Sequence, residues 1–517
     1  MNRRNFITAK KAIAAITIAS FLISLVIAPD ALALRVPEAA EQASGSAAGF
    51  KQALGTTSNA IGDYENLLRE TELLAPKEVK GLVREWGLTL GQLAKVERGV
   101  NRDPEELLSL TFDMPAIVVM LAGGGGTRVK LPETDINYGR PKVQLLLDLG
   151  GGRKRTISEL LFEQIEKAGM EPVVVLPGRP DFRADVLNTC AGKAAVTQQY
   201  PLGTGHAAMQ AERALRDYNG IAVIIYSDMP LITADMLKDL ADKCQNAKDA
   251  NVVASMLVGT LDDPLNPVNY GKVIVDSKTG DCLTIIEQRE IDKMIIGAGG
   301  QVIKDNMGKV MQRIYPQNAT VENRGAIQLP SGRIITAEEA DKSPYWNSGI
   351  YAARSPQVWD LLGGIDSDNS ASEFYLTELV TMASKAGKVV NTSVCDVEAS
   401  KYLAGINYAE QITRCSEILR ERAIQEAASR KTALLIAESE DAMASAMAML
   451  NKMKFKKIIT ATSQQEIDRI FNSGETIDLV INKAQEGMFK VPQLLPASLY
   501  LPNLPDEELL TRIEEWL

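Results

Sequence analysis

The stretch from Ile117 to Lys142, IVVMLAGGGGTRVKLPETDINYGRPK, decides the fold. It begins with an apolar, β-branched run that predicts a buried strand. The glycine cluster Gly123–Gly126 follows, and glycine there allows positive φ and lets backbone N–H groups approach an anion closely. Arg128 and Lys142 add two cations. A strand that leads into a glycine loop with two cations nearby predicts a phosphate-binding loop.

This loop differs from two better-known phosphate loops. No Gly-Lys-Ser/Thr closes it, so it is not a Walker A loop. Thr127 and Arg128 break the G-x-G-x-x-G spacing of a dinucleotide-binding turn. Taken alone, a glycine run fits a plain flexible turn better, so the phosphate interpretation depends on other segments of the chain.

The composition bounds the class of protein. With 517 residues the chain is too long for one core, so two to four domains are expected. The net charge of −10 argues against general nucleic-acid binding, which needs a basic surface. An anionic substrate would therefore be held by local cations and Mg²⁺. The five cysteines form no C-x-x-C pair, and a single histidine, His206, excludes a histidine-rich metal site.

The N-terminal residues 1–34 resemble a targeting segment. Basic residues precede an apolar run at 12–28, and Ala31-Leu32-Ala33 has a small-x-small cleavage pattern. The Arg3-Arg4 pair resembles a twin-arginine export signal. An uncleaved anchor that associates with a membrane through 12–28 is the alternative. Residues 35–112 read as a linker and then a helical segment, which we expect to pack against the next domain.

Residues 113–415 alternate between strand and helix patterns. This alternation predicts an α/β fold with a mostly parallel, Rossmann-like sheet covered by helices. In such sheets ligands bind beyond the carboxyl ends of the strands, where the glycine loop and Asp228 would both lie. A long interruption at 293–338 is interpreted as an insertion without an assigned role. Strands are expected at Ile117–Leu121, Pro172–Leu176, Ala222–Tyr226, Val252–Val258 and Val273–Val275.

Residues 430–517 predict a separate small α/β module with three strands and two helices. The pattern resembles the receiver domain of response regulators. Where a receiver carries its phosphorylated aspartate, this chain has Asn482 and Lys483. We therefore expect a docking or dimerisation module and not a phosphorelay partner, which leaves homo-oligomerisation open.

Polar residues in later segments complete the case for a binding site. Gln198 and the glycines of QQYPLGTGHA could clasp a flat base edge. Asp228 follows a predicted buried strand, the usual place for a Mg²⁺ ligand beside phosphates. Trp346–Ile350 and Glu373–Thr377 offer hydroxyl and amide groups suited to a sugar, and Asn407 supplies a second hard oxygen ligand.

Together these segments resemble the pyrophosphorylase domain of bacterial N-acetylglucosamine-1-phosphate uridylyltransferase, in the sugar-nucleotidyltransferase family. The pieces occur in family order over residues 115–410, well over half of the chain. They are LAGGGGTR (121–128), PK (141–142), Gln198 with LGTGHA (202–207), YSDMPLI (226–232), YGKV (270–273), IIEQRE (285–290), WNSGI (346–350), EFYLTE (373–378) and AGIN (404–407).

The resemblance implies roles for individual residues. The nucleotide would be bound by residues of the first three pieces and the following strand end: Leu121, Ala122, Gly123, Gly124, Gln198, Gly203, Thr204 and Tyr226. The catalytic cations facing the phosphates would be Arg128 and Lys142. The Mg²⁺ ligands would be Asp228 and Asn407. N-acetylglucosamine would be held by Gly271, Glu287, Asn347, Tyr375 and Thr377.

The implied reaction joins UTP and a sugar 1-phosphate to a UDP-sugar, with release of pyrophosphate. No hexapeptide repeat follows residue 410, so acetyl transfer is not expected. A non-catalytic UDP-sugar-binding protein and the same chemistry on another sugar phosphate are the alternatives. Nucleotide chemistry favours a cytoplasmic location, whereas the N-terminus favours export.

Several of these residues also have a plain structural interpretation. Lys142 could be a solvated surface lysine, and Asn407 could be a turn or cap residue. Glu287 could be an exposed carboxylate at a strand end. His206 begins a predicted helix after Gly205, which favours a structural role.

Overall fold

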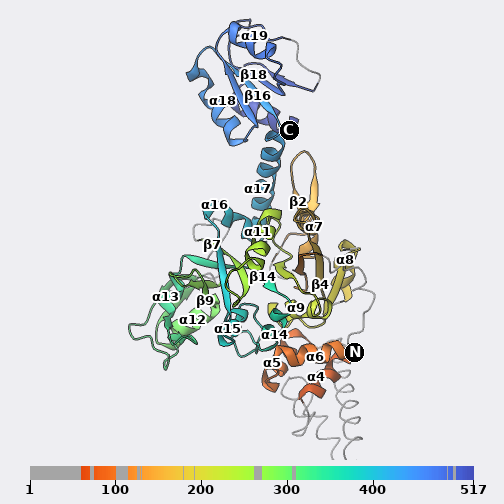
Figure 1. Ribbon diagram of the computed structural model, residues 1–517, viewed down its shortest axis with the longest axis vertical. Helices are drawn as coiled ribbons and strands as arrows, with labels where there is room; N and C mark the ends of the chain where they lie inside the picture. Colours follow the sequence, from red (N-terminus) through yellow and green to blue (C-terminus); the bar gives the residue numbers. More distant parts are fainter. Residues whose placement is uncertain are drawn as a thin grey trace, which may run out of the picture. The chain divides into compact units, whose positions relative to one another are not determined.

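The computed structural model describes residues 60–69, 75–100, 114–124, 129, 131–178, 180–190, 192–260, 270–304, 310–485, 487–492 and 497–517 (Figure 1). The predicted targeting segment 1–34, most of the linker and Arg128 lie outside these residues. Within them, no helix has both the length and the apolarity needed to cross a membrane.

The chain divides into two compact units. The first comprises the chain up to Leu145 and residues 157–407, and the second comprises residues 146–156 and 408–517. The sequence had placed the end of the nucleotidyltransferase domain at residue 415 and had not separated 146–156 from it.

The first unit is built on one mixed, mostly parallel sheet, as the sequence predicted. Six strands of its main path point the same way, and only β14 is antiparallel to its neighbours. The antiparallel strands β8 and β9 extend the sheet from β14. The order is β15 (Val389–Val394), β7 (Val252–Thr260), β14 (Tyr345–Arg354), β6 (Ile221–Tyr226), β1 (Ala116–Leu121), β4 (Glu171–Pro177) and β5 (Ala194–Gln198), with β8 (Lys272–Val275) and β9 (Cys282–Ile286) beside it.

Helices cover this sheet, and their presence explains the strand sequences. Every residue of β1 is buried, and a strand covered on both faces needs an unbroken apolar run instead of an alternating one. The helices between the strands are α7 (Ile157–Lys167), α8 (Pro180–Thr189), α9 (Thr204–Gln210), α10 (Glu212–Leu215), α11 (Ala234–Gln245), α14 (Gln357–Gly363), α15 (Glu378–Lys385) and α16 (Val397–Ser400).

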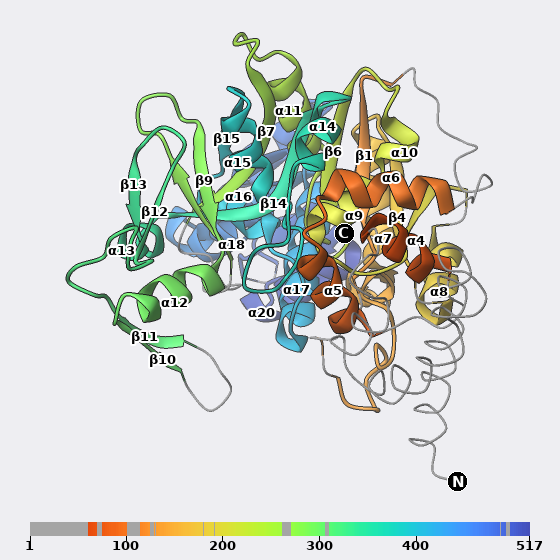
Figure 2. The same cartoon turned by 90° about the horizontal axis from the view of Figure 1, so that it is seen from below.

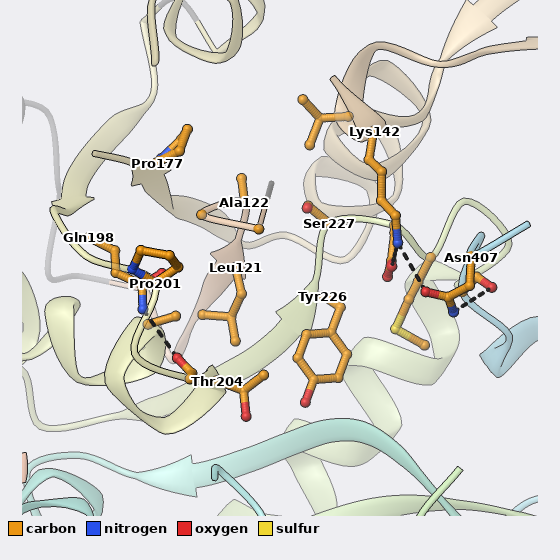
Figure 3. A pocket seen from close by; sticks show the side chains of 18 of the residues that line it. Leu121, Ala122, Lys142, Pro177, Gln198, Pro201, Thr204, Tyr226, Ser227 and Asn407 are labelled. Atoms are coloured by element: carbon orange, nitrogen blue, oxygen red, sulfur yellow. Dashed lines mark hydrogen bonds and ion pairs between the residues drawn. The ribbon is translucent and has the colours of Figure 1, made fainter. Parts of the chain in front are cut away.

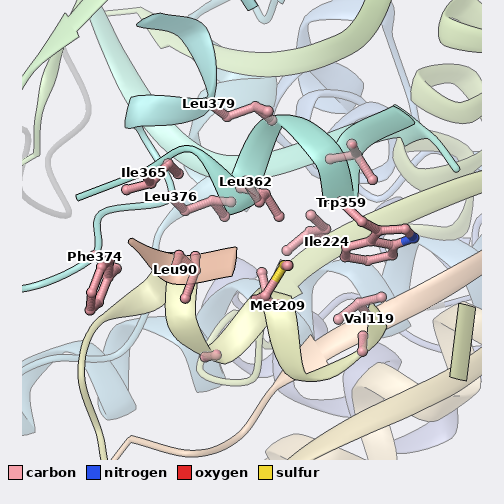
Figure 4. Packing of buried hydrophobic residues seen from close by; sticks show 14 of the residues in the cluster. Leu90, Val119, Met209, Ile224, Trp359, Leu362, Ile365, Phe374, Leu376 and Leu379 are labelled. Atoms are coloured by element: carbon pink, nitrogen blue, oxygen red, sulfur yellow. The ribbon is translucent and has the colours of Figure 1, made fainter. Parts of the chain in front are cut away.

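The N-terminal helical segment shares the core of this unit. Its helices are α4 (Ala60–Arg69), α5 (Pro76–Trp86) and α6 (Leu90–Val100), and α6 contacts both α9 and α14 (Figure 2). Leu90 of α6 belongs to the same buried cluster as Val119 of β1 and Trp359 of α14 (Figure 4). The expected packing of this segment against the following domain is confirmed.

The predicted insertion forms a small layer of its own. It contains α12 (Gln288–Gly297), the hairpin β10–β11 (Gln301–Lys304 and Val310–Ile314), the hairpin β12–β13 (Ala326–Gln328 and Ile334–Thr336) and α13 (Ala337–Asp341). Ile291 and Ile335 lie in an apolar cluster that also contains Ile274 of β8 and Ile286 of β9, so this layer packs on that edge of the sheet. Arg313 bridges Asp292 and Asp341, at 2.9 and 3.0 Å, and joins the first hairpin to both helices.

The second unit confirms the three strands and two helices predicted for its alternating part, and it adds one strand near the C-terminus and a helix at each end that were not predicted. Its sheet is fully parallel, in the order β17 (Lys457–Ala461), β16 (Thr432–Ile436), β18 (Leu479–Asn482) and β19 (Leu499–Leu501). Alternate residues of β16 enter two different apolar clusters, so both faces of the sheet are covered. The helices are α17 (Ala409–Ala428), α18 (Glu440–Lys452), α19 (Gln464–Asn472) and α20 (Asp506–Trp516).

Two features of this unit bear on the sequence interpretation. The hairpin β2–β3 (Leu146–Asp148 and Lys154–Thr156) is attached to α17, where Arg420 pairs with Asp148 at 2.7 Å. At the end of β18, Asn482 donates a hydrogen bond to the hydroxyl of Tyr500, and Lys483 pairs with Asp506. Lys483 is therefore bound to an acid of its own unit.

Candidate active site

A cavity of about 510 Å³ opens at one edge of the sheet in the first unit. β1 and β6 are parallel neighbours, with Leu121 opposite Tyr226, so the chain leaves both strands at the same edge. The predicted position of Gly123, Gly124 and Asp228 beyond the carboxyl ends of the strands is thereby confirmed. The predicted residues that line the cavity are Leu121, Ala122, Gly123, Gly124, Lys142, Gln198, Gly203, Thr204, Tyr226, Asp228, Asn347 and Asn407.

Lys142, Asp228 and Asn407 form a polar cluster at this cavity (Figure 3). The Nζ atom of Lys142 lies 2.7 Å from Oδ2 of Asp228 and 3.1 Å from Oδ1 of Asn407. The N–H of Ile406 donates to the backbone carbonyl of Asp228 at 2.8 Å, which holds the AGIN segment against the end of β6. Two oxygens from distant parts of the chain thus converge on one cationic group.

The same two oxygens fit a divalent cation. Carboxylate and amide oxygens are hard ligands of the kind Mg²⁺ prefers, and Mg²⁺ usually takes only one or two protein ligands beside phosphates and water. Their convergence on Lys142 Nζ places them within reach of one positive centre. No cluster of three or more His, Cys, Asp or Glu side chains suited to a metal occurs among the residues that the structure describes. The remaining ligands would therefore be phosphate oxygens and water.

The end of the cavity where the sequence predicts a nucleobase, here called the base end, is formed where β5 leads into α9. Gln198, the last residue of β5, donates from Nε2 to the carbonyl of Gly203 at 3.1 Å (Figure 3). Gly203 has φ 126°, and a methyl group there would lie 2.5 Å from the carbonyl oxygen of Phe374. Only glycine fits this position, because any side chain would break the contact with the EFYLTE segment. Thr204 accepts the N–H of Leu376 at 3.0 Å and ties the two segments together.

Tyr226 forms a wall of the cavity at the end of β6. Its ring packs on Gly349, which has φ 76° and where a methyl group would lie 1.9 Å from the ring. Burial raises the pKa of Tyr226, and nearby Glu287 acts in the same direction, so the hydroxyl stays protonated near neutral pH. Thr204 is its hydrogen-bond partner.

The remaining predicted sugar residues form a group beside the cavity and are absent from its described lining. Burial raises the pKa of Glu287 to about 7, although the hydrogen bond from Thr377 works against this. A methyl group on Gly271 would lie 3.1 Å from the Glu287 carboxylate, and the carbonyl of Gly271 accepts the N–H of Asn347 at 2.8 Å. Burial also raises the pKa of Tyr375. Asn347 therefore connects this group to the cavity.

Among the lining residues to which the sequence analysis gave no role are Lys80, Tyr270 and Glu373. Lys80 of α5 reaches the cavity and pairs with Glu373, which also lines it. Nothing in the helical pattern of α5 distinguishes Lys80 from a solvated lysine. Tyr270 lines the cavity and binds the N–H of Gly405 through its hydroxyl at 3.2 Å. Tyr270 and Glu373 both belong to quoted motifs, so those motifs were the available signal.

Comparisons with known proteins found relatives of part of this chain. Residues 118–279 match the model of the MobA-like NTP transferase domain. The bifunctional protein GlmU of Acetivibrio thermocellus is 25% identical over 312 residues, which cover 60% of this chain and 52% of that protein. GlmU of Paramagnetospirillum magneticum is 30% identical over 324 residues, which cover 62% and 56%. The resemblance carried by the motifs is confirmed by these matches.

Two solved structures also align with part of this chain. UDP-glucose pyrophosphorylase complexed with UDP-glucose matches with 14% identity and a TM-score of 0.36. CMP:2-keto-3-deoxy-manno-octonic acid synthetase complexed with CTP matches with 15% identity and a TM-score of 0.35. Each alignment covers 60% of this chain and all of the other. The chain spans about half the length of the curated relatives it matches.

Proposed function

We propose that this chain, which carries an NTP transferase domain, is a Mg²⁺-dependent uridylyltransferase. It would join UTP and N-acetylglucosamine 1-phosphate, or a related sugar 1-phosphate, to a UDP-sugar and pyrophosphate. The observation that carries the proposal is the cluster of Lys142, Asp228 and Asn407 at a cavity that also contains the glycine loop. Such a cluster suits a reaction between two phosphate anions, whose repulsion must be neutralised.

The layout of the cavity supports an order for the substrates. Gln198 and the Gly203 turn suit the edge of a nucleobase, and Gly123 and Gly124 suit the phosphates. Asn347 would face the sugar, with Glu287 and Thr377 behind it. The cavity volume of about 510 Å³ lies within the usual range for small-molecule sites.

The chemistry needs no covalent intermediate and no general base. An oxygen of the sugar phosphate, already anionic, attacks the α-phosphorus of UTP in line. The new P–O bond forms as the bond from the α-phosphorus to pyrophosphate breaks, and pyrophosphate leaves with its electron pair. Lys142 would stabilise the charge that builds on the α-phosphate, with Arg128 as the second expected cation. Bound Mg²⁺, held by Asp228 and Asn407, would supply Lewis-acid charge neutralisation.

The test is pyrophosphate release by the purified full chain. UTP and Mg²⁺ would be supplied with a panel of sugar 1-phosphates that includes N-acetylglucosamine 1-phosphate. Asp228→Asn should lower turnover at least about 100-fold, because it removes a charge from the phosphate site without changing its size. Asp249→Asn changes an exposed loop carboxylate of the same unit and should leave turnover unchanged.

The alternatives predict other results in this assay. Turnover with a different sugar phosphate would keep the chemistry and replace the substrate. Tight UDP-sugar binding without turnover for any sugar would refute the enzyme and favour the non-catalytic binding protein. Full activity of Asp228→Asn would refute the metal-site assignment.

A further inference from the structure

A buried hydrogen-bond network links the N-terminal helical segment to the base end of the cavity. At its centre is Glu97 of α6, whose side chain is almost completely buried. Its Oε1 atom accepts from the hydroxyl of Tyr64 at 2.6 Å and lies 2.8 Å from Nε2 of His206. Its Oε2 atom accepts from Nε2 of Gln210 at 2.8 Å. His206 is the only histidine in the chain and is fully buried.

The opposite side of His206 faces Gln198. The ring atom Nδ1 lies 2.9 Å from Nε2 of Gln198, which also donates to the carbonyl oxygen of Gly203 at 3.1 Å. A carbonyl oxygen can only accept, so the amide nitrogen of Gln198 must face this side. Its second hydrogen then points at Nδ1, which must be unprotonated to accept it. The single proton of a neutral ring therefore lies on Nε2 and is donated to Glu97.

The Glu97 carboxylate is suited to accept the hydrogen bond from the Nε2–H group of His206. Burial alone would raise the pKa of its carboxyl group. The hydrogen bonds from His206, Tyr64 and Gln210 oppose burial, and the pKa is lowered. An ionised carboxylate has only acceptor oxygens, and it selects the tautomer of His206 that carries its hydrogen on Nε2.

The orientation of the Gln198 amide has a consequence inside the cavity. With Nε2 held by Gly203 and His206, Oε1 points to the glycine loop, where a methyl group on Gly123 would lie 2.5 Å from it. Gln198 and Gly123 both line the cavity. The protein thus presents a hydrogen-bond acceptor, and not a donor, between β5 and the glycine loop.

We propose that Glu97 is a positioning residue for base selection, which acts through His206 to hold the Gln198 amide with its oxygen toward the base. This inference rests on the proposed function, because it assumes that the base lies beside Gln198. Uracil has an N–H at ring position 3 that can donate to this oxygen. Cytosine has a bare nitrogen there, which would face the oxygen with two lone pairs opposed.

The network also shows what its loss would do. Without an acceptor at Glu97, the donors left near Nε2 of His206 include Nε2 of Gln210, 3.3 Å away. Donors favour a bare Nε2, which moves the ring proton to Nδ1. A protonated Nδ1 opposes the Gln198 nitrogen, so only the hydrogen bond to the Gly203 carbonyl would still hold the amide. Reversed orientations that present N–H groups to the base would then become populated. Discrimination against cytosine would then fall.

Three variants separate this role from general stability. Glu97→Met removes the acceptor and keeps a long helix-forming side chain. Glu97→Gln keeps one acceptor oxygen for His206 and should rescue base selection. Glu212→Met is the control, because Glu212 is almost equally buried and pairs with Arg98 and Arg216, whereas the hydrogen bonds of the His206 ring in the described part of the chain go to Glu97, Gln198 and Gln210. Loss of packing alone would affect Glu97→Met and Glu212→Met alike.

The first measurement is the tautomer of the only histidine. In ¹⁵N-histidine-labelled full chain, a single pair of ring resonances reports which nitrogen carries hydrogen. We expect the proton on Nε2 in the wild type and in Glu97→Gln, and on Nδ1 in Glu97→Met. A wild-type ring protonated on Nδ1, or on both nitrogens, would overturn the inference. This result does not depend on any nucleotide, and it stands even if Glu97→Met fails to fold.

The second measurement is the ratio of the dissociation constants for CTP and UTP, from titration calorimetry on the full chain. We expect a ratio of at least about 100 in the wild type, Glu97→Gln and Glu212→Met, and a ratio at least tenfold lower in Glu97→Met. No wild-type preference, or an unchanged ratio in Glu97→Met, would overturn the inference. A preference that disappears in Glu97→Met without any pyrophosphate release would support the inference and refute the proposed catalytic function.

Discussion

Lys142→Met should change metal binding and turnover in opposite directions. In the structure, Nζ of Lys142 occupies the point on which Asp228 Oδ2 and Asn407 Oδ1 converge. A divalent cation that uses these two oxygens must first displace the ammonium group. Removing that group should therefore strengthen cation binding in the absence of substrate. In the complete reaction, the same ammonium group is needed to face the phosphates.

The size of the effect follows from the contacts. The side chains of Lys142 and Asp228 are 16% and 20% exposed, so their 2.7 Å pair is partly shielded from water. Exposed ion pairs contribute up to about 1 kcal/mol, and hydrogen bonds to charged groups about 1.5–3 kcal/mol. A cost of ~1–3 kcal/mol for breaking the pair corresponds to cation binding that is roughly 5- to 150-fold tighter in Lys142→Met. Loss of one preorganised electrostatic group should lower kcat about 100- to 1000-fold.

Two assays would test this pair of effects. Mn²⁺ binding by electron paramagnetic resonance, without nucleotide, gives the cation affinity, and pyrophosphate release gives kcat. Lys248→Met changes an exposed lysine of the same unit and should alter neither. Unchanged or weaker Mn²⁺ binding in Lys142→Met would refute the reasoning, because Lys142 and the cation would then not share these two oxygens.

Two further predictions concern Glu287 and Gly349. Burial raises the pKa of Glu287 from 4.5 to about 7, so the folded chain binds this proton more tightly. This tighter proton binding stabilises the folded state below pH 4.5, and the stabilisation is lost as the pH rises through 7. Between pH 5 and 8 this loss should lower the free energy of unfolding by roughly 2–3 kcal/mol. Denaturant titrations should show this slope reduced in Glu287→Gln, and an equal slope would count against the raised pKa. Gly349→Ala, with φ 76° and a clash with Tyr226, should destabilise by about 2–4 kcal/mol and weaken UTP binding. The control is Gly81→Ala, which lies in open space on α5 and should stabilise the fold by ~0.5–1 kcal/mol. If Gly349→Ala and Gly81→Ala had the same melting temperature, the Tyr226 ring would be able to move and the predicted clash would be wrong.

The sequence predicted those parts of the fold that local patterns encode. β1, β4 and β6 are continuous apolar runs, and each ends where polar or glycine residues begin. Because parallel strands end at a common edge, the motifs that follow β1 and β6 could be placed together without coordinates. The strand and helix alternation of the second unit could be predicted for the same reason.

Other features of the fold depend on contacts that no local pattern contains. β14 lies in the middle of the sheet and runs against its neighbours, but its interior is as buried as that of a parallel strand. An apolar run in the sequence indicates that a strand is buried, but it does not indicate whether the strand is parallel or antiparallel to its neighbours. The hairpin at 146–156 pairs with residues near 420, and short polar strands give no signal for so distant a partner.

The residues of the candidate site also differ in whether a local motif or only a distant contact identifies them. Lys142 and Asp228 lie within recognisable motifs next to strands, so their place at the cavity could be predicted from the sequence. Glu97 lies in a helix with no motif, and its meaning comes only from His206 and Gln198, which are 109 and 101 positions away. A carboxylate in an amphipathic helix is normally solvated, and only the fold shows that this one is buried.

The location of Glu97 also explains how α6 can matter to the chemistry although none of its described residues lines the cavity. α6 packs into the same apolar core as β1, so its position is fixed by the sheet that carries the glycine loop. A buried carboxylate is costly unless its hydrogen bonds are satisfied, and here Tyr64, His206 and Gln210 satisfy them. The network therefore tolerates only the arrangement in which Gln198 shows its oxygen to the cavity. Stability of the core and selection of the base would then depend on the same few hydrogen bonds.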